Sequence, residues 1–346
     1  MDKILVTGGA GYIGSHIIKN LLKEGFSVIT LDNLSAGFIE PMEIIKKEMA
    51  PPAGGPASPA GGFEFIRGDL GDKELLEKIF HENQIETVMH LAAKIYVDES
   101  VRKPELYYQE NFIKSVGLIE AMTKAGINKF IFSSSCVVYG RPQYIPIDEK
   151  HPTNPENPYG QTKLDFEKYL EKVENLQFII LRYFNVGGAE PTGLIGKSHL
   201  TSQDIMENIF KVALGQKKIF QFFGTDYPTP DGTAIRDYIH VEDISQAHIL
   251  ALEKLEKFSR EVFNLGSETG FSVREVLDKT TLIIGREIPH EAGERRPGDT
   301  AISVASAAKA KEKLGWNPQY SDLEQIIRTD WNWRKKHPLG YTRINE

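Results

Sequence analysis

Two side chains with complementary chemistry lie four residues apart in the segment 157–163, which reads Asn-Pro-Tyr-Gly-Gln-Thr-Lys. Asn157 suits a helix N-cap and Pro158 suits the first helical position, so the segment predicts a helix that begins here. On that helix Tyr159 and Lys163 project from one side, one turn apart. A nearby positive charge lowers the ordinary tyrosine pKa of about 10. The pair predicts a tyrosine general base for an alcohol or sugar hydroxyl, although a structural pair is the alternative.

Three consecutive serines at 133–135 could supply hydroxyl groups to the same reaction. They come at the end of the run Lys129–Ser133, whose residue types predict a β-strand. Ligands of parallel α/β sheets bind outside the carboxyl ends of the strands. We therefore expect Ser135 to share a proton with the substrate oxygen and Ser133 to contact the cofactor. Capping of the strand end is the alternative for both.

A glycine-rich turn follows the first predicted strand, Lys3–Thr7, and precedes a predicted helix, Tyr12–Lys23. Its glycines recur at every third position, which permits a tight turn and the close approach of a diphosphate to the helix N-terminus. Taken alone, such a triplet could be only a tight turn. The residues expected to contact a dinucleotide here are Gly8, Gly11, Tyr12, Ile13 and Gly14.

An acidic residue, Asp32, ends the second predicted strand, Ser27–Asp32. A carboxylate there can accept hydrogen bonds from the adenosine ribose and repels a 2′-phosphate, so NAD is favoured over NADP. Asp69 follows the apolar run 63–66 and could bind the adenine amino group. The alternative role for an acidic residue in this segment is a helix N-cap. That role fits Asp72 better than Asp69, because Asp72 directly precedes the predicted helix Lys73–Phe80.

The elements that must position these groups alternate between strand and helix patterns. Further strands are expected at Thr87–Leu91 and Gln177–Tyr183, and the alternation predicts an α/β fold with a Rossmann-type, doubly wound parallel sheet. We expect residues 1–185 to form an NAD-binding domain. Residues 186–346 would form a smaller mixed α/β lobe for a nucleotide sugar, with some segments returning to the first domain.

The second half is more mixed, with predicted helices at Val241–Lys257, Val273–Ile284 and Leu323–Lys336. The segment 51–62 (PPAGGPASPAGG) has no apolar period and predicts a flexible loop.

Composition excludes several classes of function. The formal net charge is −7 and no basic stripe is present, which argues against a nucleic-acid partner. The single cysteine, Cys136, cannot form an intrachain disulfide or a thiolate metal site, and no metal is expected. No apolar run approaches membrane-spanning length and the N-terminus does not read as a secretory signal. A cytoplasmic enzyme without a membrane partner is expected.

The motifs together resemble the extended short-chain dehydrogenase/reductase family, and nearly the whole chain is similar to its UDP-galactose 4-epimerases. The segments that carry the likeness are GGAGYIGSH (8–16), DNLS (32–35), SSSCVVYG (133–140), PYGQTK (158–163), LRYFNVGGA (181–189), FGTDYPTPDGTAIRDYIHVED (223–243), FNLGS (263–267) and HPLGY (337–341). The resemblance implies reversible C4 epimerisation of a UDP-hexose through a 4-keto intermediate, with tightly held NAD. It also implies a homodimer formed through two helices of the first lobe.

Further contacts are implied by the same resemblance. On the NAD side it implies Asn33, Leu70, Leu91, Ala92, Ala93, Asn111 and Tyr183, besides Tyr159 and Lys163. On the substrate side it implies the diphosphate ligands Asn185, Arg236 and Arg296, the uridine ribose ligand Asp299, and Phe223 near uracil, where a core role is equally open. For Arg295 the alternative is a solvated surface residue that binds no ligand.

Three departures from the family pattern bear on function. Lys94 stands one place before the usual lysine, which puts its reach to the cofactor in doubt, and Asp204 would be unfavourable near a diphosphate, so the segment 202–207 receives no ligand role. Ser303 stands where some epimerases carry a bulky tyrosine. It leaves room for an N-acetyl group, so we expect UDP-N-acetylglucosamine and UDP-N-acetylgalactosamine to be substrates as well, with a neutral pocket lining as the alternative.

Two competing functions use the same fold. A nucleotide-sugar 4,6-dehydratase needs an acid and a base after the serine, where this chain has Cys136 and Val137. A non-catalytic NAD-binding protein would have no need of the pair formed by Tyr159 and Lys163.

Overall fold

The computed structural model describes residues 2–49, 62–198, 204–296 and 299–342. Apart from Gly62, the expected flexible loop lies outside the described residues. So do the first two residues of the segment 202–207.

A seven-stranded sheet with parallel neighbours throughout forms the centre of the fold, and it confirms the expected α/β class. Its strand order is β10-β6-β5-β4-β1-β2-β3. The strands are β1 (Lys3–Thr7), β2 (Ser27–Asp32), β3 (Phe63–Arg67), β4 (Ile85–His90), β5 (Lys129–Ser135), β6 (Gln177–Tyr183) and β10 (Glu261–Leu265). β4 begins two residues before the expected strand Thr87–Leu91, and β5 continues through the serine run.

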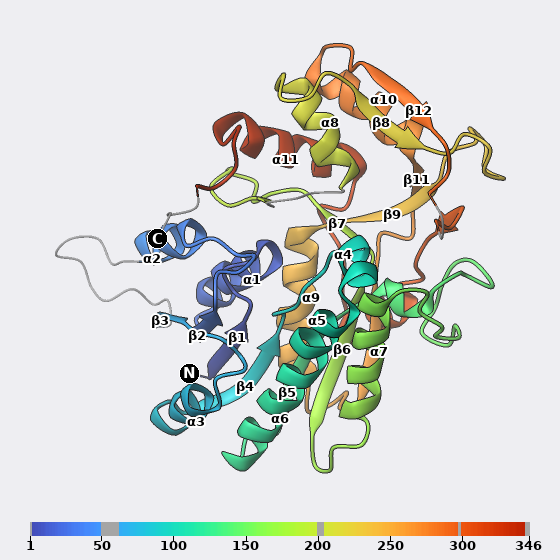
Figure 1. Ribbon diagram of the computed structural model, residues 1–346. Helices are drawn as coiled ribbons and strands as arrows, with labels where there is room; N and C mark the ends of the chain where they lie inside the picture. Colours follow the sequence, from blue (N-terminus) through green and yellow to red (C-terminus); the bar gives the residue numbers. More distant parts are fainter. Residues whose placement is uncertain (1, 50–61, 199–203, 297–298, 343–346) are drawn as a thin grey trace.

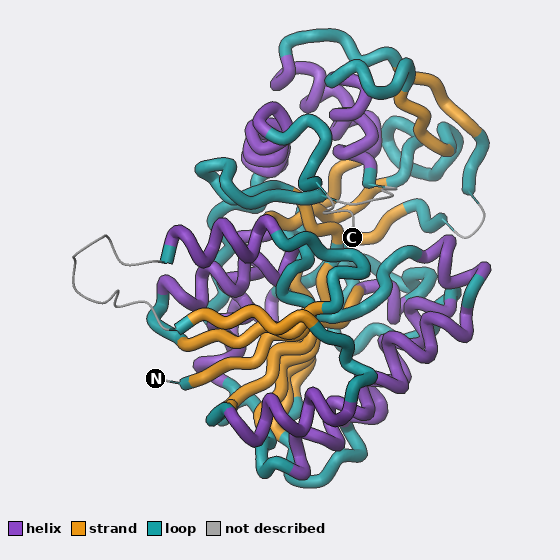
Figure 2. The backbone as a smooth tube through the Cα atoms, turned by 60° about the vertical axis from the view of Figure 1, so that its left-hand side comes forward, coloured by secondary structure: helices purple, strands orange, loops and turns teal. Residues whose placement is uncertain are grey.

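Both faces of this sheet are buried, because successive side chains of a strand point to opposite faces and helices cover each face. In β1, Ile4 and Val6 pack into one apolar cluster and Leu5 into another. The first cluster lies under α1 (Tyr12–Lys23), α2 (Glu40–Glu48) and α9 (Val241–Lys254). The second lies under α3 (Lys73–Glu82), α6 (Lys114–Lys124) and α7 (Pro158–Leu170), and Figure 2 shows the sheet between the two helical layers.

The strand order reverses between β1 and β4. A ligand of a doubly wound sheet binds at such a point. The loops after these two strands approach each other closely: a Cβ atom on Gly8, whose φ is +76°, would lie 2.6 Å from the backbone nitrogen of Ala92. Glycine at position 8 is therefore required both by the turn and by the neighbouring loop.

The remaining elements gather beyond the carboxyl edge of the sheet, in the upper part of Figure 1. β9 (Ile235–His240) pairs with β7 (Asn185–Gly187), β11 (Gly270–Ser272) and β13 (Ile302–Ser303). β8 (Phe220–Phe223) pairs with β12 (His290–Gly293). The helices here are α8 (Ile205–Ala213), α10 (Val273–Ile284) and α11 (Leu323–Lys336). The bounds of α10 and α11 agree with the sequence, whereas α9 ends three residues before the expected Lys257. The domain boundary near residue 185 stays a prediction.

Shorter helical segments complete the described chain. On the α7 side they are α4 (Val97–Arg102), α5 (Pro104–Tyr108) and the π-helix η1 (Gln109–Ile113), which runs directly into α6. The other two are the 3-10 helix η2 (Cys136–Tyr139) after β5 and the π-helix η3 (Ala310–Leu314).

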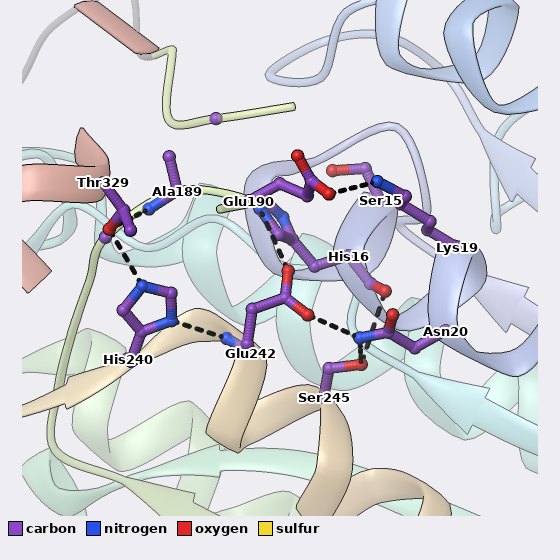
Figure 3. Close-up of polar contacts among 12 residues, drawn as sticks. Ser15, His16, Lys19, Asn20, Ala189, Glu190, His240, Glu242, Ser245 and Thr329 are labelled. Atoms are coloured by element: carbon purple, nitrogen blue, oxygen red, sulfur yellow. Dashed lines mark hydrogen bonds and ion pairs between the residues drawn. The ribbon is translucent and has the colours of Figure 1, made fainter. Parts of the chain in front are cut away.

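Buried polar contacts join α1 to the segments beyond the sheet edge (Figure 3). The Lys19 ammonium lies 2.6 Å from a carboxylate oxygen of Glu190, and both side chains are buried. The next residue of α1, Asn20, donates to Glu242 and to Ser245 of α9, at 2.8 and 2.9 Å. These contacts fix the helix that follows the glycine-rich turn against the second half of the chain.

Candidate active site

The amino end of α7 carries Tyr159 and Lys163 on one helix, as the sequence predicts. The Asn157 side chain caps the helix by accepting from the backbone N–H of Gly160 at 2.9 Å, and Pro158 occupies the first turn. Tyr159 and Lys163 are 8% and 4% exposed, so both lie on the buried side of the helix. The Lys163 ammonium donates to the backbone carbonyl of Ser133 at 2.8 Å, which ties α7 to the carboxyl end of β5.

Burial is the largest influence on the pKa values of this pair. Burial raises the pKa of Tyr159 to about 12, opposed by a hydrogen bond from Ser135. Burial also lowers the pKa of Lys163 to about 7, opposed by the nearby Glu167 carboxylate. As the pH rises, Lys163 therefore loses its proton before Tyr159 does. The contact between Tyr159 and Ser135 brings the expected base and the expected hydroxyl together.

A buried ion pair lies behind this site and was not found from the sequence. Glu167, one turn after Lys163, accepts from Arg182 of β6 and from the Ser134 hydroxyl. Arg182 also donates to the Tyr139 hydroxyl at 2.9 Å. Neighbouring serines of the run therefore have different partners: Ser134 contacts the ion pair and Ser135 lies near Tyr159. The helical spacing of Lys163 and Glu167 was the available signal.

The glycines of the turn before α1 differ in how closely other atoms approach them. A Cβ atom on Gly14 would lie 2.4 Å from the Gly8 carbonyl oxygen, whereas the nearest atom to one on Gly11 would be 3.2 Å away. Gly14 is therefore fixed by packing, and Gly11 stands at the more open side of the turn. No side chain caps the start of α1 and no acidic residue lies in its first turn. The N–H groups and partial positive charge there suit an anionic group.

The side chains around the glycine-rich turn make contacts within the protein. The Tyr12 hydroxyl donates to the Gly188 carbonyl at 2.6 Å, and Ile13 packs against the apolar core, so their backbone is what remains for a ligand. Asp32 accepts from the backbone N–H of Ala10 at 3.0 Å and of Leu34 at 2.8 Å. Burial raises the pKa of Asp32, and these two hydrogen bonds oppose the shift. The carboxylate is therefore held at the mouth of the turn.

Asp69 lies beside Asn33, as an adenosine site would require. Asn33 donates to Asp69 at 2.7 Å, and the Lys114 ammonium lies 2.8 Å from the other carboxylate oxygen. Partial burial opposes ionisation of Asp69, but hydrogen bonds led by that from Lys114 outweigh it and lower the pKa. Leu70 beside it is buried. Asp72 caps α3 by accepting from Leu75 at 3.0 Å, which confirms its expected role.

The loop after β4 is held by Asn111. Its side-chain oxygen accepts from the backbone N–H of Lys94 at 2.8 Å, and its amide donates to the Lys94 carbonyl at 3.0 Å. The loop residues Leu91, Ala92 and Ala93 stand beside the glycine-rich turn, since the Leu91 N–H donates to the Thr7 carbonyl at 3.0 Å. Asn111 thus shapes the loop, and a direct contact with NAD stays a prediction.

The residues expected on the substrate side come from several separate segments. The Arg236 guanidinium lies 3.7 Å from Asp299 and donates to the Thr300 carbonyl at 2.8 Å. Ser303 pairs with Arg236 in the register of β13 and β9. The Asn185 amide, on β7, donates to the Asp237 carbonyl at 3.0 Å.

A second group of these residues lies on the β8 side of the same region. Arg296 lies over the Phe223 ring, with its guanidinium carbon 4.1 Å from the ring centroid. Arg295 lies over the Tyr227 ring at 4.2 Å and pairs with the exposed Asp226. Because the Arg295 side chain already has these two partners at the surface, the surface alternative for it stays open. The roles of all these residues stay predictions.

The departure at Asp204 has a local cause. Its carboxylate accepts from the Glu207 N–H at 3.0 Å as the N-cap of α8, and it lies 2.7 Å from the Lys197 ammonium. Lys197 is buried and also lies 5.4 Å from the centroid of the Tyr12 ring. The negative charge that would be unfavourable near a diphosphate is therefore neutralised by a lysine seven residues earlier.

Comparisons with known proteins agree with this arrangement. The model of the NAD dependent epimerase/dehydratase family matches residues 4–266. A UDP-glucose 4-epimerase of Halalkalibacterium halodurans is 44% identical over 347 residues, which covers 99% of this chain and 98% of the relative. A crystal structure of a UDP-glucose 4-epimerase has a TM-score of 0.90 at 44% identity and covers 99% of this chain and 100% of that chain. The Bifidobacterium longum UDP-glucose 4-epimerase, solved in complex with NAD⁺ and UDP, has a TM-score of 0.89 at 37% identity, with 98% and 100% covered.

Proposed function

The chain belongs to the NAD dependent epimerase/dehydratase family, and we propose that Tyr159, Ser135 and Lys163 carry out in it the reversible C4 epimerisation of a UDP-hexose with NAD. The observation that carries the assignment is that Tyr159, buried on α7, lies close enough to Ser135 at the carboxyl end of β5 for the serine hydroxyl to lower the pKa of the tyrosine. It occurs in a chain that is 44% identical, over nearly its full length, to a UDP-glucose 4-epimerase.

The residues divide the chemistry among them. Bound NAD supplies hydride acceptance at C4 and hydride return to the opposite face of the 4-keto sugar. Tyr159 takes the proton of the sugar 4-hydroxyl and gives it back, while Ser135 holds that oxygen by a hydrogen bond. Burial alone keeps the pKa of Tyr159 at about 12, so ionisation near neutral pH requires added positive charge. Oxidised NAD and the ammonium form of Lys163 both carry such charge.

The cofactor fits the residues that would hold it. The uncapped start of α1 and the open side of Gly11 suit the diphosphate, and Asp32 at the mouth of the turn suits the adenosine ribose. On the substrate side, Arg236 and Arg296 would bind the UDP diphosphate, because guanidinium groups bind such oxygens bidentately. Asn185 would assist them, Asp299 would bind the uridine ribose, and Phe223 would pack near uracil beneath Arg296.

The nucleotide-sugar 4,6-dehydratase alternative is disfavoured by the two residues after Ser135. That reaction needs an acid and a base there, and burial raises the pKa of the Cys136 thiol to about 12. The thiol therefore stays protonated at neutral pH, and Val137 has no proton to exchange. The experiment is incubation of the purified protein with UDP-glucose and with UDP-galactose, followed by separation of the products. Each sugar nucleotide should yield the other, and a dehydrated 4-keto product would contradict the proposal.

Tyr159→Phe tests the assigned base and excludes a non-catalytic NAD-binding protein. Loss of a general base lowers the rate by about 10²–10⁴-fold, and NAD binding should persist. Tyr144→Phe is the matched control, since its exposed hydroxyl donates only to Asp148, at 2.7 Å. Unchanged epimerase activity of Tyr159→Phe would contradict the assignment.

We also propose that N-acetylated UDP-sugars are substrates. Ser303 lies on β13 beside Arg236, and a serine there leaves space that a tyrosine would fill. The protein should turn over UDP-N-acetylglucosamine and UDP-glucose at comparable rates. Ser303→Tyr should abolish turnover of the N-acetyl sugar and spare UDP-glucose. Strict rejection of the N-acetyl sugar by the unmodified protein would contradict the proposal.

A homodimer through η1, α6 and α7 is a further proposal. Tyr108 and Ile113 are 45% and 43% exposed, and the Tyr108 ring stacks on Phe112 with centroids 4.9 Å apart. Phe112 in turn meets Tyr169 of α7 edge to face. Sedimentation should give a dimer for the protein and a monomer for Ile113→Glu. A monomeric unmodified protein would contradict it.

Two coarser proposals concern the organisation and location of the chain. Residues 1–185 form the NAD-binding domain and 186–346 the nucleotide-sugar lobe, and β10 and α9 return to the first domain, as their packing on the seven-stranded sheet supports. A cytoplasmic location accords with the lone buried thiol, because reducing compartments keep thiols free. No helix among the described residues is long and apolar enough to span a membrane. Cell fractionation tests the location.

A further inference from the structure

His248 of α9 is a fully buried histidine with no assigned role, and its surroundings fix which nitrogen carries the proton. Its Nδ1 atom lies 2.9 Å from the Ile244 carbonyl oxygen, which can only accept a hydrogen bond. Nδ1 therefore carries a proton. Burial lowers the pKa of His248 to about 4, so the ring is neutral at pH 7 and its Nε2 atom is a bare acceptor.

Two hydroxyl groups converge on that acceptor. The Tyr183 hydroxyl oxygen lies 2.9 Å from Nε2 and the Ser133 hydroxyl oxygen lies 3.3 Å from it. The two oxygens are also in direct hydrogen-bond contact with each other. All three residues are buried, and they come from β5, β6 and α9.

The hydroxyl protons of Ser133 and Tyr183 are both used within this group of three residues. The contact between the two oxygens uses one hydroxyl proton, and the contact with Nε2 uses the other. This holds whichever of the two groups donates to the ring. Neither hydroxyl then has a proton left for a third group, so Ser133 and Tyr183 can only accept. A protonated Nε2 would reverse this by releasing one hydroxyl to donate outward.

The acceptors lie at the catalytic centre. Ser133 and Tyr183 occur at the carboxyl ends of β5 and β6, where ligands of such sheets bind. The Ser133 carbonyl receives the Lys163 ammonium at 2.8 Å, and Tyr183 lies close enough to Tyr159 for the two phenols to affect each other electrostatically. A ligand group that complements this pair must carry a hydrogen-bond donor, an O–H or an N–H, and the nicotinamide carboxamide carries an N–H.

We propose that His248 is a positioning residue of the cofactor pocket, which keeps the Ser133 and Tyr183 hydroxyls as acceptors for the carboxamide N–H of bound NAD. The inference rests on the proposed use of NAD. His248 itself touches neither cofactor nor substrate in this proposal, and it acts only through the two hydroxyls.

The test compares the affinities of the full-length protein for NAD and for 3-acetylpyridine adenine dinucleotide, which has a methyl group in place of the amide nitrogen. One hydrogen bond corresponds to a preference for NAD of about tenfold. His248→Leu should reduce that preference to about twofold or less. His248→Gln should retain it, because the glutamine side chain can place an acceptor near the Nε2 position. Ile249→Ala, a partly buried apolar site on the same helix, is the control and should also retain it.

Each outcome decides the question. Equal affinity of the unmodified protein for the two dinucleotides overturns the inference, as does an unchanged preference in His248→Leu. If His248→Leu does not fold, Tyr183→Phe removes one acceptor oxygen and keeps the ring, and an unchanged preference there has the same consequence. Failure of the unmodified protein to bind NAD or to epimerise UDP-glucose would instead contradict the proposed function.

Discussion

Glu190→Gln is the substitution whose effect the structure sets most directly. Glu190 lies 2.6 Å from Lys19, with both side chains buried, and this contact joins α1 to the segment after β7. Burial opposes ionisation of Glu190, but hydrogen bonds from Lys19 and Thr192 outweigh it and lower its pKa from 4.5 to about 2. At about 1.36 kcal/mol per pKa unit, the ionised carboxylate contributes about 3 kcal/mol of stability at pH 7.

The sign of the pH dependence is set by the direction of the shift. Because the pKa in the folded state is the lower one, the unfolded chain binds the proton first as the pH falls. The contribution is complete above about pH 4.5 and is lost as the pH approaches 2. Urea unfolding should show that Glu190→Gln lowers the free energy of unfolding by about 3 kcal/mol at pH 7 and by about 2 kcal/mol at pH 3.5.

Two further measurements make this prediction specific. Lys19→Met combined with Glu190→Gln should cost less than the two single changes added together, because the pair is removed as a unit. Glu77→Gln is the control: it breaks the exposed contact between Glu77 and Lys124, and it should leave stability unchanged. A loss below about 1 kcal/mol at pH 7, or the same loss at both pH values, would refute the reasoning.

Three more predictions rest on local geometry. Gly14→Ala places a Cβ atom 2.4 Å from the Gly8 carbonyl, so it should lower the melting temperature and weaken NAD binding, whereas Gly117→Ala, with open space around it in α6, should do neither. Asp72→Ala removes the N-cap of α3 and should cost about 1 kcal/mol in urea unfolding; no loss would show that the cap contributes nothing. Asp32→Ser removes the carboxylate that repels a 2′-phosphate, so the affinity for NADP relative to NAD should rise, and an unchanged ratio would contradict its role.

The parts of the site that could be predicted are those whose signal is local. The spacing from Gly8 to Gly14, the position of Asp32 at a strand end, and the helical spacing of Tyr159 and Lys163 each lie within one element or one turn. The bounds of β1, β2 and α1 agree with the sequence for the same reason, since β1 and β2 are short, mostly apolar runs and α1 has apolar residues at helical spacing.

The parts that could not be predicted depend on partners far apart in the chain. Ser133 and His248 are separated by 115 positions, and Lys19 and Glu190 by 171, so no spacing rule brings them together. The same holds for Asn111, whose amide is used by the loop after β4. The resemblance implies that Asn111 contacts NAD, and no local spacing indicates that its side-chain oxygen accepts from the backbone of Lys94.

To predict the pKa of Tyr159, both the local spacing and the burial imposed by the whole fold are needed. The spacing places Tyr159 and Lys163 on the buried side of α7, yet burial lowers the pKa of Lys163 to about 7 and raises that of Tyr159 to about 12. Burial penalises the charged form of each group, so it favours the neutral amine of Lys163 and the neutral phenol of Tyr159. Under the proposed function, the positive charge of oxidised NAD would favour the phenolate of Tyr159, so removal of the sugar proton would depend on the presence of the hydride acceptor.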